Sequence, residues 1–368
     1  MPVLTSASVE SAKLAGVTHL KINQGILAAL SAAALFGLST PLAKLLVGTI
    51  SPLLLAGLLY LGSGLGLGIL LTVRVIIQGR ASIIWPRGAD LMWLIAAIAF
   101  GGLIGPYLLM SGLLLTDSAS ASLILNLEGV FTALLAWFVF KENFDQRIAA
   151  GMALIVAGGV VLSTGAALHA VGIVGPAAIA GACLAWGIDN NLTRKVSIND
   201  AMLTACLKGL IAGPVSIALA VRYGARLPPG MLVVQSGLLG FAGYGLSLTL
   251  FVLALRNLGT ARTGAYFSLA PFIGAALAVA LGAPLTATLL IAGLFMAAGV
   301  WLHLTEHHSH QHRHLPLEHE HSHIHDSHHQ HEHGAQDPGA EPHSHVHVHL
   351  PLEHSHPHYP DVHHRHDH

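Results

Sequence analysis

Ten apolar runs, each close to the length that crosses a bilayer, dominate the chain up to about Leu304. A transmembrane helix needs about 20 consecutive apolar residues. Runs of that length cover residues 22–47, 52–73, 90–114, 118–140, 146–164, 171–193, 199–221, 231–255, 260–281 and 284–304. Charged residues make up only 10% of the chain and hydrophobic residues 53%, which is far from the balance of a soluble domain. The sequence therefore predicts an all-α membrane protein of about ten transmembrane helices.

Basic residues are distributed unevenly over the segments that connect these runs. If the N-terminal segment 1–21 is cytoplasmic, eleven lysines and arginines lie on the inner side and only Arg222 and Arg226 lie outside. Inner loops of membrane proteins carry the excess of positive charge, so we expect this orientation, in a bacterial inner (cytoplasmic) membrane. The even number of spans also returns the C-terminus to the cytoplasm.

The ten runs divide into two related sets of five, residues 22–164 and 171–304. Three stretches match between the sets: SASASLILNLEGVFTALLAW (118–137) with TARTGAYFSLAPFIGAALAV (260–279), AAGMALIVAGGVVL (149–162) with IAGLFMAAGVWL (291–302), and ALFGLSTPLAK (34–44) with LAWGIDNNLTR (184–194). Because the unit has an odd number of helices, its second copy must cross the membrane in the opposite direction. Inverted repeats of this kind place a shared site near the midplane at the repeat interface.

These stretches also carry a family resemblance. The small-residue first helix, LEGVFTALLAWFVFKENF with GMALIVAGGVVL, and SLAPFIGAALAVALGAPL with GLFMAAGVWL resemble the EamA family of the drug/metabolite transporter superfamily over residues 25–303. The resemblance implies a ten-helix secondary carrier, usually an exporter of metabolites, amino acids or drugs, without enzymatic chemistry or a required cofactor. The family's usual proline in the fourth span is replaced by Glu128-Gly129, whereas Pro271 keeps it in the ninth. We therefore expect a specialised acidic site in the first half.

Three ionisable residues lie inside the apolar runs: Glu128 in span four, Asp189 in span six and Lys208 in span seven. Each costs about 2.5 to 3.5 kcal/mol to insert, and such residues usually face a transport pathway. Lys208 is the only deep basic residue, which makes it the natural partner of one of the two acids. The functional interpretation is a substrate or proton site, and the structural one is a buried ion pair that ties spans together. Lys44 is better explained by snorkelling to the outer surface.

Other polar and aromatic side chains in the spans are further candidates for the pathway. We include Asn126, Trp186, Asn190, Tyr244 and Tyr266. Hydroxyl and amide groups often bond between membrane helices for about 0.6 kcal/mol each. Helix packing therefore explains most such groups when they are taken singly.

Histidines fill the segment that follows the last span. Residues 303–368 contain 25 histidines, many in H-x-H alternation, and tracts of this type are typical of metal binding. Imidazole suits nickel, cobalt and zinc. The candidate ligands are His319, His321, His323, His325, His343, His345, His347, His349, His354, His356 and His358. The tail repeats itself as well, since residues 314–329 and 349–364 agree at 11 of 16 positions.

The tail, residues 305–368, also changes charge with pH. Ten acids and two arginines give it a net charge of −8 when its histidines are neutral and +16 when all are protonated. Histidine titrates near pH 6.5, so the segment is suited to sensing protons. It has too few apolar residues for a packed core, which predicts disorder.

Three functions remain open from the sequence. The first is a proton-coupled secondary exporter whose tail binds nickel, cobalt or zinc, either to collect cargo or to regulate the carrier. The second is an exporter of metabolites, amino acids or drugs whose tail only buffers metal. The third is a membrane metal sensor or storage protein that transports nothing. Walker, nucleophile-elbow and dinucleotide motifs are absent from the sequence, which argues against an ATP-driven pump or an enzyme. The expected partners are the lipid bilayer and a small-molecule or metal-ion substrate, without nucleic acid, and a homodimer is compatible with these features.

Overall fold

The structure is a computed structural model that divides into two compact units, Met1–Glu306 and His307–His368. It describes residues 6–79, 88–140, 146–166, 172–196, 200–258, 263, 266–304, 309–314, 317–323, 343–349 and 352–357. In the first unit the described elements are helical, and the second unit contains strands. The fold class predicted for the membrane part, all-α, is therefore confirmed over the described residues.

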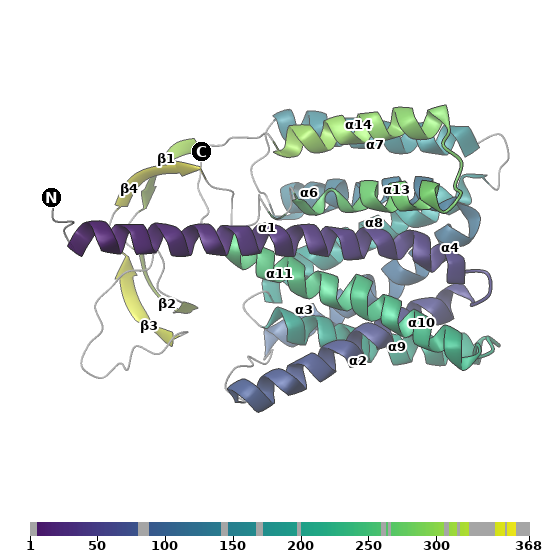
Figure 1. Ribbon diagram of the computed structural model, residues 1–368, viewed down its shortest axis with the longest axis horizontal. Coiled ribbons are helices and arrows are strands. Elements are labelled where there is room, and N and C mark those ends of the chain that lie inside the picture. The colour runs from purple at the N-terminus through teal and green to yellow at the C-terminus, as the bar shows by residue number, and fades with distance from the viewer. Residues whose placement is uncertain are drawn as a thin grey trace. The chain divides into compact units, whose positions relative to one another are not determined.

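Helices occupy each of the five apolar runs of the first half (Figure 1). They are α1 (Ser6–Leu46), α2 (Pro52–Gln78), α3 (Ala89–Ala97), η2 (Ile98–Ile104), α4 (Gly105–Leu115), α5 (Ser118–Ile124), α6 (Leu127–Phe140) and α7 (Gln146–Ala166). The third run is α3, η2 and α4 in succession, where η2 is a π-helical segment. The fourth run is broken into α5 and α6.

The second half repeats this order. Its helices are α8 (Val174–Val196), α9 (Ala201–Arg222), α10 (Gly230–Gly240), η4 (Phe241–Leu246), α11 (Ser247–Leu258), α13 (Ala270–Ala280) and α14 (Ala287–Leu304). A π-helical segment again interrupts the third run of the half, at η4. Matching Phe100 with Phe241 also matches Gly102 with Gly243, so η2 and η4 occupy corresponding positions.

Six stretches of the described helices are long and apolar enough to cross a membrane. They are Gln24–Leu46, Pro52–Gln78, Asp90–Leu115, Ser118–Val139, Met202–Arg222 and Gly230–Ala254. Three shorter apolar helices cover Ala149–Ser163, Ala270–Ala280 and Ala287–Leu302. A multi-pass membrane protein is thus supported by length and composition, while the full count of ten crossings stays a prediction.

Helices of the two halves pack against each other throughout the unit. Helix α2 of the first half lies along α9 of the second, and α7 lies along α14 (Figure 1). Helix α1 contacts α11 and α13, and α8 contacts α4 and α6. The interior of the unit is therefore built from helices of both halves.

Glycines bring α2 and α9 into backbone contact. A Cβ atom added at Gly209 would lie 2.6 Å from the Cα atom of Gly64, and one added at Gly213 would lie 2.7 Å from the Cα atom of Leu61. Real Cβ atoms do not approach so closely, so this seam tolerates no side chain at these positions. At one end of the seam, Arg74 of α2 forms a 2.5 Å ion pair with Asp200, which caps α9.

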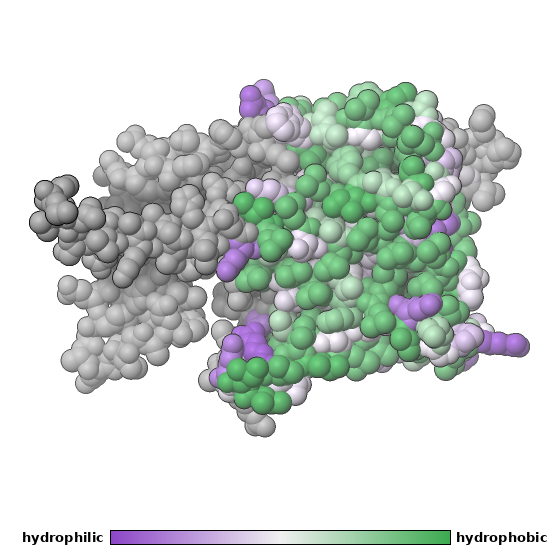
Figure 2. Space-filling view, in the orientation of Figure 1, coloured by the Kyte–Doolittle hydropathy of each residue, from purple (hydrophilic) through white to green (hydrophobic). Residues whose placement is uncertain are grey.

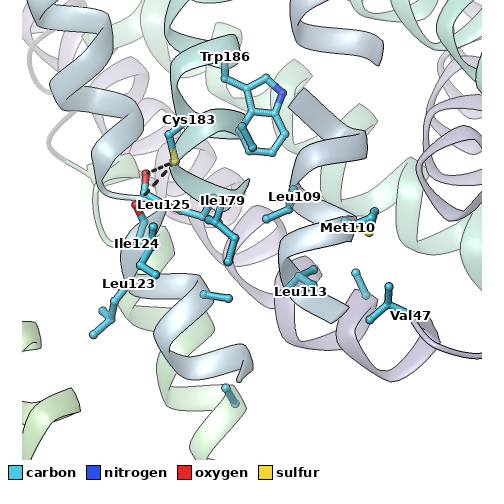
Figure 3. Packing of buried hydrophobic residues seen from close by; sticks show 14 of the residues in the cluster. Val47, Leu109, Met110, Leu113, Leu123, Ile124, Leu125, Ile179, Cys183 and Trp186 are labelled. Atoms are coloured by element: carbon cyan, nitrogen blue, oxygen red, sulfur yellow. Dashed lines mark hydrogen bonds between the residues drawn. The ribbon is translucent and has the colours of Figure 1, made fainter. Parts of the chain in front are cut away.

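Tightly packed apolar side chains fill the region where α4, α5 and α8 meet (Figure 3). The Cys183 thiol of α8 faces the carbonyl oxygens of Ile124 and Leu125 at 3.7 and 4.0 Å, at the break between α5 and α6. Cys183 and Cys206 are both buried and free. Both therefore serve as packing residues.

The outer surface of the helical unit is apolar. Figure 2 shows hydrophobic residues over most of the visible face, with most of the hydrophilic ones near the ends of the bundle. Side chains such as Ile76 and Leu294 are 78% and 71% exposed. A continuous apolar surface of this kind marks contact with a membrane rather than with water.

The tail contains four strands, which corrects one prediction. Strand β1 (Ser309–His314) pairs with β4 (Leu352–Pro357), and β2 (Leu317–His323) pairs with β3 (His343–His349), both antiparallel. The prediction of a disordered tail is therefore wrong for these four segments. The H-x-H pattern alternates every second residue, which is the period of a strand.

Candidate functional site

The break in span four places Glu128 at the beginning of a helix. Helix α5 ends at Ile124 and α6 begins at Leu127, so Glu128 lies in the first turn of α6. A helix N-terminus stabilises negative charge there. The second half has the same break, because α13 begins at Ala270 with Pro271 in its first turn. Glu128 and Ala270 are matching positions of the repeat, so one half presents an acid where the other has none.

Glu128 is tied to α8 through an amide. Asn190 Nδ2 donates to Glu128 Oε1 at 2.9 Å and to the Thr132 hydroxyl, one turn later on α6, at 3.3 Å. Asn191 Nδ2 donates to the Thr132 carbonyl at 3.1 Å. Glu128 is partly exposed and Asn190 is exposed. The two asparagines thus hold α6 and α8 together while the carboxylate stays accessible.

Asp189 forms a buried ion pair with Lys208 of α9. Lys208 Nζ donates to Asp189 Oδ1 at 2.5 Å, and the Thr193 hydroxyl donates to the same oxygen at 2.8 Å. Lys208 and Asp189 are 8% and 9% exposed. The expectation that Lys208 pairs with one of the two acids is confirmed, and the partner is Asp189. This carboxylate is compensated, whereas Glu128 contacts no basic side chain among the described residues.

A single backbone carbonyl in η2 connects the ion pair to two aromatic residues. The Tyr60 hydroxyl donates to the Gly101 carbonyl at 2.6 Å, and Trp186 Nε1 donates to it at 3.1 Å. A Cβ atom added at Gly101 would collide with the Asp189 carboxylate. Gly101 therefore lets the carboxylate of one half approach the backbone of the other. Tyr244 of η4 completes this region, with its ring against those of Phe36 and Tyr60.

Two of the predicted pathway residues make their contacts elsewhere. Asn126 is 7% exposed and donates to the Leu123 carbonyl at 2.9 Å, where α5 ends. Tyr266 packs on the small cluster of Ala28, Ala29 and Ala254. Both environments agree with the packing interpretation.

Lys44 caps the C-terminus of the neighbouring helix α4. Its Nζ donates to the Leu113 carbonyl and, at 2.9 Å, to the Thr116 carbonyl, at the C-terminus of α4. The last carbonyls of a helix lack intrahelical partners. Snorkelling alone is therefore an incomplete account of Lys44, which also caps α4.

Sequence reasoning missed several residues of this site. The sequence does contain a clue to Phe36, because the repeat alignment matches it with Trp186. It also contains a clue to Thr193, which follows Asp189 by one helical turn. Gly101 and Tyr60 lie in apolar runs with nothing around them to mark their role.

In the tail, the register of the strands pairs histidine positions with each other. In β2 and β3, His319 lies opposite His347, His321 opposite His345 and His323 opposite His343, while His349 lies opposite Leu317. In β1 and β4, His312 lies opposite His354 and His310 opposite His356. His325 and His358 lie outside the described residues. Over the side chains that the structure does describe, no group of three or more histidines, cysteines and acids gathers.

Known sequences agree with this architecture. The EamA-like transporter family matches residues 23–164 and 173–305, one stretch for each half. The chain belongs to this family. It is 28% identical over 294 residues to an uncharacterized transporter of Methanothermobacter thermautotrophicus, covering 76% of this chain and 85% of that one. It is 22% identical over 280 residues to the uncharacterized transporter YyaM of Bacillus subtilis, covering 72% and 90%.

A solved crystal structure shares the fold of this EamA-family chain. It superimposes with a TM-score of 0.58 and 21% identity, and the match covers 77% of this chain and 97% of that one. The family and the relatives together make this protein a multi-pass membrane transporter, in contact with lipid and acting on a small-molecule substrate.

Proposed function

We propose that this EamA-family transporter is a secondary exporter that exchanges its substrate for protons at the site formed by Glu128, Asn190, Asp189 and Lys208. The observation that supports the proposal is that these four residues come from both halves of the membrane unit. Glu128 comes from α6 of the first half, and the other three come from α8 and α9 of the second. A movement of one half against the other changes access to a site built from both.

The two carboxylates have different roles in this proposal. The Lys208 ammonium already compensates Asp189, so this pair positions α8 against α9. Glu128 has an amide partner and accessible surface, and a carboxylate at membrane depth requires a cation or a proton to offset its charge. Alternate binding of a proton and of the substrate by Glu128 would couple their movements.

Transport by purified protein tests this assignment. Glu128→Gln should abolish proton-driven substrate movement in proteoliposomes while the protein keeps its abundance and monodispersity. Asp189→Asn should abolish it too, with a loss of stability because it leaves the Lys208 ammonium buried without its partner. Ser247→Ala is the matched control, because Ser247 is a buried polar residue whose hydroxyl donates to the Ala32 carbonyl of α1, away from the four residues of the site. Wild-type transport by both acid variants would leave the cluster a structural one.

We also propose that the tail binds nickel, cobalt or zinc. The support is the strand register, which places histidine opposite histidine at three positions of one ribbon and two of the other. Directly opposite residues of antiparallel strands have Cβ atoms about 4.5 to 5.5 Å apart, a spacing that suits two imidazoles on one metal ion.

Deleting residues 306–368 separates cargo collection from regulation in cells challenged with each metal. If the tail collects cargo, the truncated carrier should still confer metal resistance, with a weaker apparent affinity. If the tail regulates transport of another substrate, that transport should lose its dependence on metal. Unchanged metal content and unchanged transport in both forms would refute a role for the tail.

The proposed membrane orientation has its own test. With both termini in the cytoplasm, a reporter fused after residue 304 should be active as a cytoplasmic enzyme and inactive as a periplasmic one. Periplasmic alkaline phosphatase activity at that position would overturn the orientation and a cytoplasmic role of the tail together.

A further inference from the structure

Four aromatic residues form a closed ring at the junction of the two halves. Phe36 and Tyr60 come from the first half, and Trp186 and Tyr244 come from the second. Ring centroids are 6.4 Å apart for Trp186 and Phe36, 6.1 Å for Phe36 and Tyr244, and 5.6 Å for Tyr244 and Tyr60. The circle closes through the Gly101 carbonyl, which accepts from both Tyr60 and Trp186.

This ring differs from ordinary core packing in two respects. Phe36, Tyr60 and Tyr244 keep part of their surface accessible, although all three pack against buried clusters. The Tyr244 hydroxyl is buried near the Ser39 hydroxyl, which donates to the Phe36 carbonyl, and among the described residues it makes no hydrogen bond of good geometry. Buried polar groups are nearly always paired, so an unpaired hydroxyl beside accessible rings indicates a position where a ligand binds.

The ring lies next to negative charge. Asp189 follows Trp186 by one turn of α8, and its carboxylate packs against Gly101, whose carbonyl closes the ring. Glu128 is bonded to the next residue, Asn190. With all three groups ionised, Glu128, Asp189 and Lys208 carry a net charge of −1. Aromatic faces and nearby carboxylates both attract cations and repel anions.

We propose that the substrate is an organic cation, an ammonium group with apolar substituents, held by these four aromatic residues with Glu128 as its counter-charge. The inference rests on the proposed transport function and names its substrate class. A cation over the face of Trp, Tyr or Phe is attracted by the ring when it lies within about 6 Å of the ring centroid. The apolar substituents would pack against the accessible parts of the rings, and the Tyr244 hydroxyl would orient a polar end of the molecule.

The same chemistry disfavours a transition metal at this site. Nickel, cobalt and zinc prefer imidazole and thiolate ligands. The described side chains around the ring are aromatic, amide, hydroxyl and carboxylate groups and the Lys208 ammonium, and the one nearby thiol, Cys183, faces the Ile124 and Leu125 carbonyls. If an organic cation is the cargo, the tail does not collect cargo, and its metal either regulates transport or is only buffered there.

Binding to the full-length protein in nanodiscs tests the substrate class. Radiolabelled benzyltrimethylammonium is the probe. Choline and 3,3-dimethyl-1-butanol, which has nearly the same shape as choline but no charge, are tested separately as competitors that displace the probe. Choline should compete at least tenfold better than the neutral alcohol. Equal competition, or no saturable binding of the probe, would overturn the proposal.

Substitutions localise the binding. Trp186→Leu and Tyr244→Leu should each weaken probe binding about tenfold, whereas Tyr244→Phe should keep most of the affinity because it keeps the ring. Trp93→Leu is the matched control, since Trp93 is 40% exposed and lies outside the ring. Loss of binding in Trp93→Leu and Trp186→Leu alike would refute the location.

The outcomes also separate this inference from the function on which it rests. Proton-driven transport that depends on Glu128, without a preference for choline over its neutral isostere, refutes the substrate class and leaves the exporter intact. A clear preference for the cation, with transport indifferent to Glu128, refutes the proton exchange and supports the substrate class.

Discussion

The membrane unit and the tail are both duplicated, but their copies have changed to different degrees. In the membrane unit, matching positions of the repeat now differ in chemistry, since Asp189 corresponds to Ser39 and Glu128 corresponds to Ala270. In the tail, 11 of 16 positions of residues 314–329 and 349–364 are still identical, and the paired strands place histidine opposite histidine. The two halves of the membrane unit have diverged and now form one asymmetric cluster of charges. The tail repeats have stayed similar, and the tail contains a series of similar histidine pairs.

The contrast has a consequence for mutation. A cluster with one ammonium and two carboxylates fails when a single member is removed, because its charges depend on each other. Repeated histidine pairs are independent of one another, so removing some of them should reduce binding by degrees.

The largest effect is expected at Lys208. Lys208→Met leaves the Asp189 carboxylate buried without its cation, which should lower the free energy of unfolding by about 3 to 5 kcal/mol. The double variant Lys208→Met/Asp189→Asn should be more stable than Lys208→Met alone. Denaturation in detergent micelles measures both. Additive losses in the double variant would show that the pair does not act as a unit.

A smaller effect is expected at Gly101. Gly101→Ala forces a methyl group against the Asp189 carboxylate, and overpacking of this kind costs about 1 to 3 kcal/mol. Its counterpart in η4 is already Ala242, so the control Ala242→Gly removes a methyl group without displacing an acid. Transport should fall sharply in Gly101→Ala and little in Ala242→Gly. Similar transport defects in both variants would mean that η2 and η4 contribute equally to transport.

In the tail, the order of residues should matter as well as their number. Reordering residues 318–323 from Glu-His-Glu-His-Ser-His to Glu-Glu-His-His-His-Ser keeps the composition but removes two of the three cross-strand histidine pairs of β2 and β3. Metal affinity of the full-length protein, measured by calorimetry, should fall about tenfold, or about 1.4 kcal/mol. Unchanged affinity would show that the count of histidines is sufficient.

Acid should weaken the same metal binding. Metal ions need neutral imidazole, and histidine protonates near pH 6.5, so affinity should be full above about pH 7.5 and decline below about 6.5. Titrations at several pH values measure this. Affinity that stays constant down to pH 5 would point to the carboxylates as ligands.

The smallest effect is expected at Ser39. Its hydroxyl donates to the Phe36 carbonyl within the same helix at 2.6 Å. Ser39→Ala should therefore cost less than about 1 kcal/mol, in contrast to Asp189→Asn at the matching position. A loss of transport as severe as that of Asp189→Asn would end the distinction between the two halves.

The helices and the pairing of Lys208 could be predicted from the sequence because long apolar runs and isolated charges are local signals. The partner of Lys208 could not be chosen, since both acids were equally plausible until α8 and α9 were placed side by side. Tyr60 and Phe36 matter through contacts with residues far away in the sequence, such as Gly101 and Tyr244 for Tyr60 and Trp186 for Phe36. Apolar runs give no sign of such contacts. The strands of the tail could have been inferred from the two-residue alternation of its histidines, but the low apolar content favoured disorder.

The glycine seam between α2 and α9 also constrains how the protein is made. Helix α2 enters the membrane early, and its partner α9 is synthesised roughly 10 to 30 seconds later at ordinary ribosome speeds. Until then the glycine face of α2, including Gly64, has only lipid or a foreign helix against it, and small residues allow close approach of any helix with a similar face. The first half should therefore pair promiscuously when expressed alone, and assembly of the native bundle depends on the second half arriving in the same chain.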